Sequence, residues 1–258
     1  MPWLGFGVAY IDADKVKDSV LTAIKAGYRS IDTAKDYGNE EDVGNAVREC
    51  DIPRNELFIT TKVWNADQGY EQTLKAFEVS RQKLGLDYID LYLIHWPVKE
   101  KFKETWKALE KLYRDGFVRA IGVSNFNIHH LEELINSSSI NPMINQVELH
   151  PLLSQKKLRD FCKSNKIQIE AWSPLMQGAL NIPELVNIGK KYGKTPAQVV
   201  LRWDIQNGIV TIPKSSTERR IIENSDIFDF ELSSEDMNII NGLNENKRLG
   251  PDPDNFNF

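Results

Sequence analysis

The sequence has few cysteines and no long apolar run. Its two cysteines, Cys50 and Cys162, are too few for a disulfide framework, which indicates a reducing compartment. No run approaches the ~18 apolar residues of a membrane-spanning helix. No basic stretch precedes the first apolar residues, so no secretory signal is expected. We therefore expect a cytoplasmic protein.

An excess of basic residues is also missing. The chain has 32 Lys and Arg against 37 Asp and Glu, which leaves a net charge of −5. This mild acidity argues against a nucleic acid or an anionic membrane as a partner. A composition of 41% hydrophobic and 27% charged residues is typical of a globular protein and excludes disorder. No apolar stripe stands out as an interface, so a monomer is favoured over an oligomer.

No low-complexity segment or linker rich in Pro, Gly or Ser divides the chain, so residues 1–258 are expected to form a single domain. Instead, an apolar run of strand character recurs, each time followed by an amphipathic segment of helical period. The starts of these runs lie roughly 30 residues apart, about the length of one strand-plus-helix unit. The expected strands are residues 3–8, 29–34, 57–63, 88–96, 118–125, 144–151, 167–174 and 208–215.

The runs are nearly continuous in Val, Ile and Leu, as in parallel strands that are covered on both faces. Eight such units in a chain of this length predict a closed (β/α)8 TIM barrel. An open, doubly wound sheet is the alternative, and periodicity alone does not separate the two. Additional helices are expected at residues 182–192, at 196–206 and from about Ser233, and residues 248–258 should form a loop or tail.

Several segments resemble known chemical motifs but lack an essential part. Gly5-Phe6-Gly7 lacks the third glycine of a Rossmann fingerprint, because Tyr10 stands in its place. Residues 189–195 have three rather than four residues between the glycines of a phosphate-binding loop. The four histidines show no zinc-protease spacing, so no metal site is expected. His129 and His130 are interpreted as part of a solvated helix face.

Four polar residues at successive strand ends are the strongest chemical signal. Asp32 and Lys62 each follow apolar residues, so both should be desolvated and must pair. A cation beside a tyrosine commonly lowers the pKa of the phenol from its free value of about 10, and Tyr37 follows Asp32 closely. A tyrosine tuned in this way can donate a proton near neutral pH. The alternative is a structural ion pair against which Tyr37 and His95 merely pack.

The segments that carry these residues resemble the aldo-keto reductase family. The resemblance covers essentially the whole chain and is closest to compact bacterial members, which include 2,5-diketo-gluconate reductases and glyoxal or methylglyoxal reductases. The segments are Gly27-Tyr-Arg-Ser-Ile-Asp32-Thr-Ala-x-x-Tyr37-x-Asn39-Glu40, Thr61-Lys62-Val-Trp64, Leu93-Ile-His95-Trp96-Pro97 and Ile212-Pro-Lys214-Ser215.

The resemblance implies a (β/α)8 barrel that binds NADPH in extended form, without a Rossmann unit, and reduces aldehydes and ketones to alcohols. The substrates would be small aldehydes, α-dicarbonyls such as methylglyoxal, or keto-sugars. Tyr37 would be the general acid, Lys62 held by Asp32 would support it, and His95 would orient the carbonyl group. These four are the predicted catalytic residues.

The resemblance also assigns cofactor and substrate contacts. Ser124, Asn125 and Gln146 would hold the nicotinamide carboxamide, and Trp172 would stack on the ring. Two cations on the 2′-phosphate would favour NADP(H) over NAD(H). Trp64 and Trp96 would wall the substrate pocket. The remaining positions are Ser173, Leu175, Gln177 and Gly178 on the diphosphate path, Lys214, Ser215, Ser216 and Arg220 at the 2′-phosphate, and Glu223 and Asn224 at the adenine.

Lys35, Asp36 and Ala9 differ from the residues common in the family, since the first two are more charged and the third is smaller. These differences bear on substrate preference and activity. Two other functions remain open. One is a non-catalytic NADP(H)-binding regulatory or structural protein. The other is a barrel isomerase or aldolase that uses Lys62 to form a Schiff base.

Overall fold

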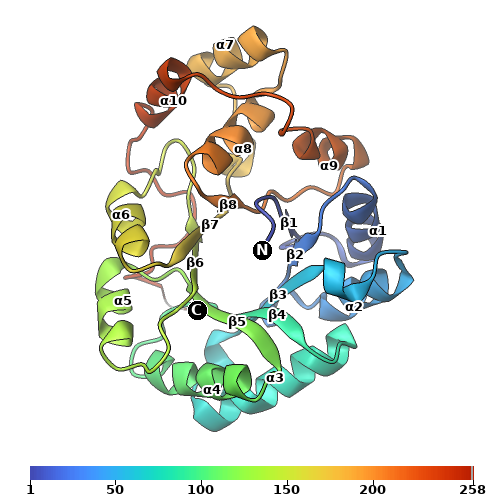
Figure 1. Ribbon diagram of the computed structural model, residues 1–258, viewed down its shortest axis with the longest axis vertical. Coiled ribbons are helices and arrows are strands. Elements are labelled where there is room, and N and C mark those ends of the chain that lie inside the picture. Colours follow the sequence, from blue (N-terminus) through green and yellow to red (C-terminus); the bar gives the residue numbers. More distant parts are fainter. Residues whose placement is uncertain (257) are drawn as a thin grey trace.

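The computed structural model describes residues 1–256 and 258. Within them, eight parallel strands form one sheet in the order of the chain, β1 to β8. Each strand is followed by at least one helix on the outside of the sheet (Figure 1). The strands are Phe6–Gly7 (β1), Ser30–Asp32 (β2), Phe58–Val63 (β3), Ile89–Ile94 (β4), Val118–Ser124 (β5), Ile144–Glu148 (β6), Gln168–Trp172 (β7) and Val210–Thr211 (β8).

The sheet closes on itself between its first and last strands. Leu4 and Thr211 form a parallel bridge just before β1, and the Gly5 amide donates to the Thr211 carbonyl oxygen at 2.9 Å. Beyond the bridge, the Gly7 amide donates to the Pro213 carbonyl oxygen at 3.1 Å. The prediction of a (β/α)8 barrel is therefore confirmed, and the open sheet is excluded.

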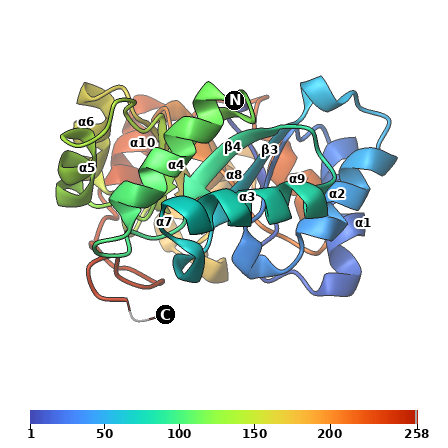
Figure 2. The same ribbon diagram turned by 90° about the horizontal axis from the view of Figure 1, so that it is seen from below.

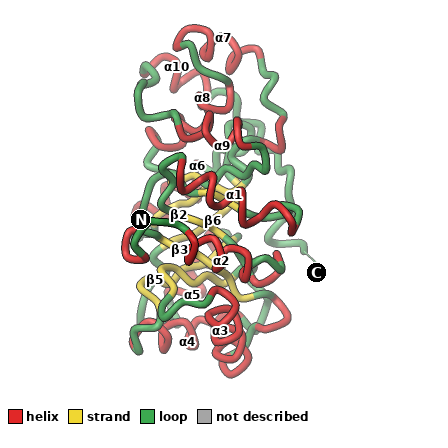
Figure 3. The backbone as a smooth tube through the Cα atoms, turned by 90° about the vertical axis from the view of Figure 1, so that its right-hand side faces the viewer, coloured by secondary structure: helices red, strands yellow, loops and turns green. Residues whose placement is uncertain are grey.

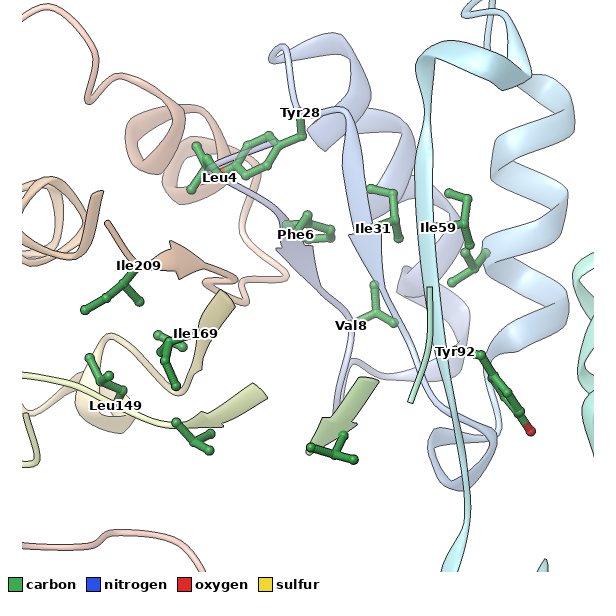
Figure 4. Packing of buried hydrophobic residues seen from close by; sticks show 14 of the residues in the cluster. Leu4, Phe6, Val8, Tyr28, Ile31, Ile59, Tyr92, Leu149, Ile169 and Ile209 are labelled. Atoms are coloured by element: carbon green, nitrogen blue, oxygen red, sulfur yellow. The ribbon is translucent and has the colours of Figure 1, made fainter. Parts of the chain in front are cut away.

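The core lies between the strands and the helices around them. Phe6, Ile31 and Ile59 point outward from three neighbouring strands into this layer (Figure 4). The ring of Phe6 packs edge-on against Tyr28, with 5.7 Å between the ring centroids. Burying each such side chain contributes roughly 1.5–3 kcal/mol. Because side chains alternate along a strand, the residues between these apolar ones point into the barrel.

The predicted strands are longer than the observed ones, most clearly at the two ends of the sheet. The expected strand at residues 3–8 is reduced to Phe6–Gly7, and the one at 208–215 to Val210–Thr211. Apolar character marks the buried part of each run, but only residues with a partner on the next strand form the ladder. The rest of each run leads into loops.

The predicted helices at residues 182–192 and 196–206 are confirmed, as is the last one. The Thr195 hydroxyl accepts from the Gln198 amide, and the Ser233 hydroxyl accepts from the Asp236 amide, so both helices begin with a side-chain cap. The helices are Ala13–Lys25 (α1), Glu40–Glu49 (α2), Tyr70–Leu84 (α3), Phe102–Arg114 (α4), Ile128–Ile135 (α5), Lys156–Ser164 (α6), Pro183–Tyr192 (α7), Pro196–Gln206 (α8), Glu218–Ser225 (α9) and Ser234–Asn241 (α10), with short turns Lys35–Tyr37 (η1), Arg54–Glu56 (η2), Asn65–Asp67 (η3) and Met176–Gly178 (η4).

The tail, residues 248–258, has no helix or strand in its described part, as predicted. The Glu148 carboxylate at the end of β6 accepts from the Leu249 amide at 2.7 Å and from the Gly250 amide at 3.2 Å. The two chain ends lie on opposite sides of the barrel (Figures 2 and 3). The tail is therefore fastened at the end of the barrel where the strands finish. None of the described helices is long and apolar enough to cross a membrane.

Candidate active site

Asp32, the last residue of β2, and Lys62 in β3 form a buried ion pair inside the barrel. Lys62 Nζ donates to Asp32 Oδ1 at 2.6 Å and to the Thr33 carbonyl oxygen at 3.0 Å. The Lys62 side chain is 0% exposed and that of Asp32 is 3% exposed. Burial opposes the ammonium, but the Asp32 charge and its hydrogen bond outweigh it and keep the pKa of Lys62 above its usual value. The predicted pairing is confirmed.

Tyr37 ends the short turn η1, where Gly38 adopts a left-handed conformation with φ 67°. Its phenol oxygen accepts a hydrogen bond from Lys62 Nζ at 3.4 Å. Burial nevertheless raises the pKa of Tyr37 to about 12, because it outweighs the opposite effect of the Lys62 charge. The prediction that Lys62 brings this pKa below its free value is therefore wrong here. The phenol is protonated at neutral pH, which is the state that a proton donor needs.

His95 directly follows β4 and completes the predicted catalytic group. Its ring is 5.7 Å from that of Tyr37 and 5.1 Å from that of Trp64, between centroids, and both contacts are edge-on. Burial and the Lys62 charge hold the pKa of His95 well below its usual value. The imidazole is therefore neutral. Its buried Nδ1 has no hydrogen-bond partner among the described residues.

The residues expected at the nicotinamide end are linked in one network across the ends of β5, β6 and β7. The Ser124 hydroxyl donates to the Gln146 carbonyl oxygen at 2.9 Å, and Asn125 Nδ2 donates to Ser124 Oγ at 3.1 Å. Trp172 Nε1 donates to Asn125 Oδ1 at 2.8 Å. Asn125 Nδ2 also donates to the His95 carbonyl oxygen at 3.0 Å, so the network reaches the catalytic group. The structure brings these four predicted residues together.

The predicted diphosphate residues lie on the loop that follows Trp172. Ser173 and Gln177 both have φ 53°, and Gly178 has φ 92°. Gln177 Nε2 donates to the Leu249 carbonyl oxygen at 3.4 Å, which connects this loop to the tail. Leu175 is half-buried and directly precedes the turn η4. The left-handed residues bend this loop sharply beside the nicotinamide end.

The predicted 2′-phosphate and adenine residues occupy the loop after β8 and helix α9. Lys214, Ser216 and Arg220 are exposed. Neither cation forms an ion pair within residues 1–256 and 258. Ser215 is buried, and its hydroxyl accepts from the Thr217 amide at 3.1 Å. The sequence analysis did not predict α9 as a helix, because it is short and polar, yet it carries Arg220, Glu223 and Asn224.

These groups fit NADPH. Unpaired cations near a helix amino terminus suit a phosphate. Hydroxyl and amide side chains suit a carboxamide, and a half-buried indole offers a flat face to an aromatic ring. The chemistry of the side chains therefore matches both ends of this cofactor.

Aromatic residues of the tail complete a wall with Trp64 and Trp96. The ring of Phe258 stacks on that of Trp64 with 5.9 Å between centroids and lies 5.2 Å from that of Trp96. Phe256 lies 5.1 Å from Trp96. A cavity of about 910 Å³ opens beside this wall, bordered by Phe102 as well. The sequence analysis assigned the two phenylalanines no role, and two aromatic residues in a polar tail were a weak signal for one.

The sequence analysis interpreted His130 as part of a solvated helix face, and the structure shows that this was wrong. Only 13% of its side chain is exposed, and Nδ1 accepts from the Asn127 amide at 3.1 Å, which caps α5. Burial, aided by His129, lowers the pKa of His130 to about 4. His129, His130 and Asp254 place ligand atoms within 4.8 Å of one another. Because Nδ1 of His130 is an acceptor, Nε2 of the neutral ring carries the hydrogen and is not a ready metal ligand.

The sequence analysis missed two further contacts of ionisable residues. Lys35 Nζ lies 2.5 Å from Asp67 Oδ2, so an ion pair joins the turn that carries Tyr37 to the turn after Trp64. Glu170 on β7 points into the barrel and accepts from Gln146 Nε2 at 2.8 Å. It is a single charge within an apolar run, which is the same signal that identified Asp32 and Lys62.

The comparisons with known proteins agree with this geometry. The Aldo/keto reductase family model matches residues 3–245. The chain is 62% identical over 260 residues to the glyoxal reductase of Bacillus subtilis (strain 168), covering 100% of this chain and 94% of that protein.

Two solved structures are also similar. MGS-M4, an aldo-keto reductase from a Medee basin deep-sea metagenome library, has a TM-score of 0.98 at 48% identity, covering 100% of this chain and 97% of the other. A mutant of Gox0644 in complex with NADPH has a TM-score of 0.96 at 43% identity, covering 100% and 95%. The chain belongs to the aldo/keto reductase family.

Proposed function

We propose that this protein is an NADPH-dependent carbonyl reductase that converts small aldehydes, α-dicarbonyls or keto-sugars to alcohols. The observation that carries the proposal is the chain of hydrogen bonds from the buried Asp32 and Lys62 to the half-buried Tyr37 phenol, with neutral His95 beside it. This chain ends at the carboxyl ends of the strands, where barrel enzymes build their active sites.

Tyr37 donates its proton to the carbonyl oxygen as negative charge develops there. Bound NADPH supplies the hydride to the carbonyl carbon. Lys62, kept charged by Asp32, stabilises the tyrosinate that forms, which offsets the high pKa of the buried phenol. His95 is neutral and orients the carbonyl group by a hydrogen bond, without adding a positive charge.

The cofactor residues take the roles that their chemistry fits. Ser124, Asn125 and Gln146 bind the carboxamide, and Trp172 stacks on the nicotinamide ring. The loop after β7 follows the diphosphate through Ser173, Leu175, Gln177 and Gly178. Lys214, Ser215, Ser216 and Arg220 bind the 2′-phosphate, and Glu223 and Asn224 contact the adenine. Both cations are exposed and free of ion pairs in the described part of the chain, which favours NADPH over NADH.

Trp64 and Trp96 wall the substrate pocket, together with Phe256 and Phe258, which pack against them. An apolar aromatic wall next to a proton donor suits a carbonyl compound with a small body. The glyoxal reductase to which the chain is similar supports a dicarbonyl as the first substrate to try.

Residues 1–258 act as a single domain and a monomer in the cytoplasm, without a metal or nucleic acid. The free thiols of Cys50 and Cys162 support a reducing compartment, and the net charge of −5 argues against a nucleic-acid partner.

Steady-state consumption of NADPH with methylglyoxal tests the proposal, with NADH in parallel and Tyr37→Phe as the variant. We expect turnover with NADPH, weaker turnover with NADH, and loss of turnover in the variant while NADPH still binds. Binding of NADPH without turnover of any simple aldehyde would favour a non-catalytic NADP(H)-binding protein. Substrate trapped on Lys62 by borohydride would favour an isomerase or aldolase.

A further inference from the structure

The barrel holds a second buried carboxyl group close to Lys62. Glu170 lies in the middle of β7 and is 0% exposed. Its neighbours in register are Gln146 on β6 and Val210 on β8. Ile169 and Ala171 flank it and belong to the apolar core outside the barrel, so Glu170 points inward. It therefore shares the barrel interior with the Asp32–Lys62 pair.

One amide group joins the two acids. Gln146 Nε2 donates to Asp32 Oδ2 at 2.8 Å and to Glu170 Oε2 at 2.8 Å. An amide nitrogen carries two hydrogens, and both are used in these bonds. Gln146 is therefore held by an acid on each side, and only its side-chain oxygen is left for a ligand.

The charges in the barrel do not balance if both acids are ionised. Lys62 is a single cation that already pairs with Asp32 at 2.6 Å. A second carboxylate would be a buried anion without a partner of its own, which is costly. Glu170 Oε1 is buried and has no hydrogen-bond partner among the described residues, so a charge on it would be unsolvated. The neutral acid is the form that this site accommodates.

The titratable groups around Glu170 also favour its neutral form on balance. Burial and the Asp32 charge raise the pKa of Glu170 to about 8, although the Gln146 hydrogen bond and the Lys62 charge act against them. Tyr37, whose phenol oxygen lies 3.4 Å from Lys62 Nζ, is protonated and adds no charge. On α6, which packs on the outside of β7, Cys162 is neutral because burial raises its pKa to about 12.

We propose that Glu170 is a positioning residue that holds a hydrogen at neutral pH and, through Gln146, keeps Asp32 on Lys62 and the Gln146 oxygen free for the cofactor. It touches neither substrate nor reacting atom and acts through Gln146. This inference rests on the proposed function for the roles of Lys62 and Gln146, but the hydrogen on Glu170 can be measured without turnover.

The hydrogen on Glu170 is tested with Glu170→Gln, which has the shape of the neutral acid. The infrared difference spectrum at pH 7 should show the carbonyl stretch of one protonated carboxyl group that the variant lacks. Glu148→Gln is the matched control, because the pKa of the buried Glu148 is lowered by its contacts with His150 and the tail amides. That control should lose no such band.

Thermal unfolding of the same pair gives a second measure. An acid whose pKa is raised on folding makes the protein less stable as pH rises from the pKa of the unfolded chain to that of the folded protein. The reason is that the acid ionises first in the unfolded chain. The Tm of Glu170→Gln relative to the unaltered protein should therefore increase between about pH 4.5 and about pH 8 and then level off. A Tm difference that stays constant over this range, with no band lost in the infrared spectrum, would overturn the proposal.

The positioning role is tested by kinetics with Glu170→Leu beside Glu170→Gln. Leucine removes the acceptor, so one Gln146 hydrogen loses its partner, and KM for NADPH should rise about tenfold while kcat falls about threefold. Glutamine should keep both within about twofold at pH 7 and should retain activity at pH 9 better than the unaltered protein does. If both variants leave KM, kcat and the pH profile unchanged, Glu170 positions nothing. If the unaltered protein has no turnover, the proposed function fails, while the spectroscopic and thermal results still decide where the hydrogen lies.

Discussion

The catalytic group and the tail both contact Trp64, through His95 and Phe258, but the two regions are held in different ways. Asp32 and Lys62 belong to neighbouring strands, are almost fully buried, and are fixed by hydrogen bonds of 2.6–3.0 Å. Phe256 and Phe258 belong to a tail without secondary structure in its described part. Their rings pack at 5.1–5.9 Å between centroids, and one hydrogen bond, from Asn65 Nδ2 to the Phe258 carbonyl oxygen at 3.0 Å, is added to this packing. The barrel thus fixes the chemistry, whereas loops set what reaches it.

This contrast predicts different costs for changes in the two regions. A change among the strand residues should reduce both stability and kcat, because the same bonds serve both. A change in helix α9 or the tail should alter KM and the choice of ligand, with little effect on kcat.

Lys62→Met should have the largest effect. It leaves the Asp32 carboxylate buried without its partner, which costs about 3–5 kcal/mol in the free energy of unfolding. It also removes the charge that stabilises the Tyr37 tyrosinate, so kcat should fall about a thousandfold. Urea denaturation and steady-state kinetics measure the two effects. The exposed Lys75→Met is the control, and equal behaviour of the two variants would show that the buried pair has no special role.

Arg220→Gln should have an intermediate effect, confined to the cofactor. Loss of one charge-assisted hydrogen bond to the 2′-phosphate should raise KM for NADPH about tenfold to a hundredfold, while KM for NADH stays the same. The neighbouring Arg219 is also exposed, so Arg219→Gln serves as the matched control on the same helix. A parallel rise in both KM values would place the 2′-phosphate elsewhere.

Phe258→Ala should have the smallest effect. Removing a ring that stacks on Trp64 at 5.9 Å should raise KM for an aromatic aldehyde about threefold and leave kcat for methylglyoxal unchanged. The exposed Phe228→Ala is the control. A loss of kcat with methylglyoxal would mean that the tail takes part in the chemistry itself.

Residues inside strands were predicted better than residues in loops. The eight apolar runs predicted the barrel because strand period and burial are encoded locally. The Asp32–Lys62 pair was predicted because a charge in an apolar run must find a partner. Glu170 satisfies the same rule and was overlooked, so this part of the site was readable from the sequence.

The rest depends on tertiary packing. The pKa of Tyr37 could not be predicted because burial of the phenol depends on how the turn η1 folds against the barrel, and that burial outweighs the Lys62 charge. The position of Phe258 depends on tail contacts that start at Glu148, about a hundred residues earlier in the chain. His130 belongs to an amphipathic helix. Its ring caps that helix by accepting from the Asn127 amide, and this contact depends on the side-chain orientation in the folded protein.

The central claim is that Tyr37 transfers the proton during carbonyl reduction. A single-turnover measurement tests it most directly, with NADPH already bound and methylglyoxal added to the unaltered protein and to Tyr37→Phe. The account predicts an equal Kd for NADPH in the two proteins and a rate of NADPH oxidation at least about a thousandfold lower in the variant. An unchanged rate at an unchanged Kd would contradict the account, since the proton would then come from another group.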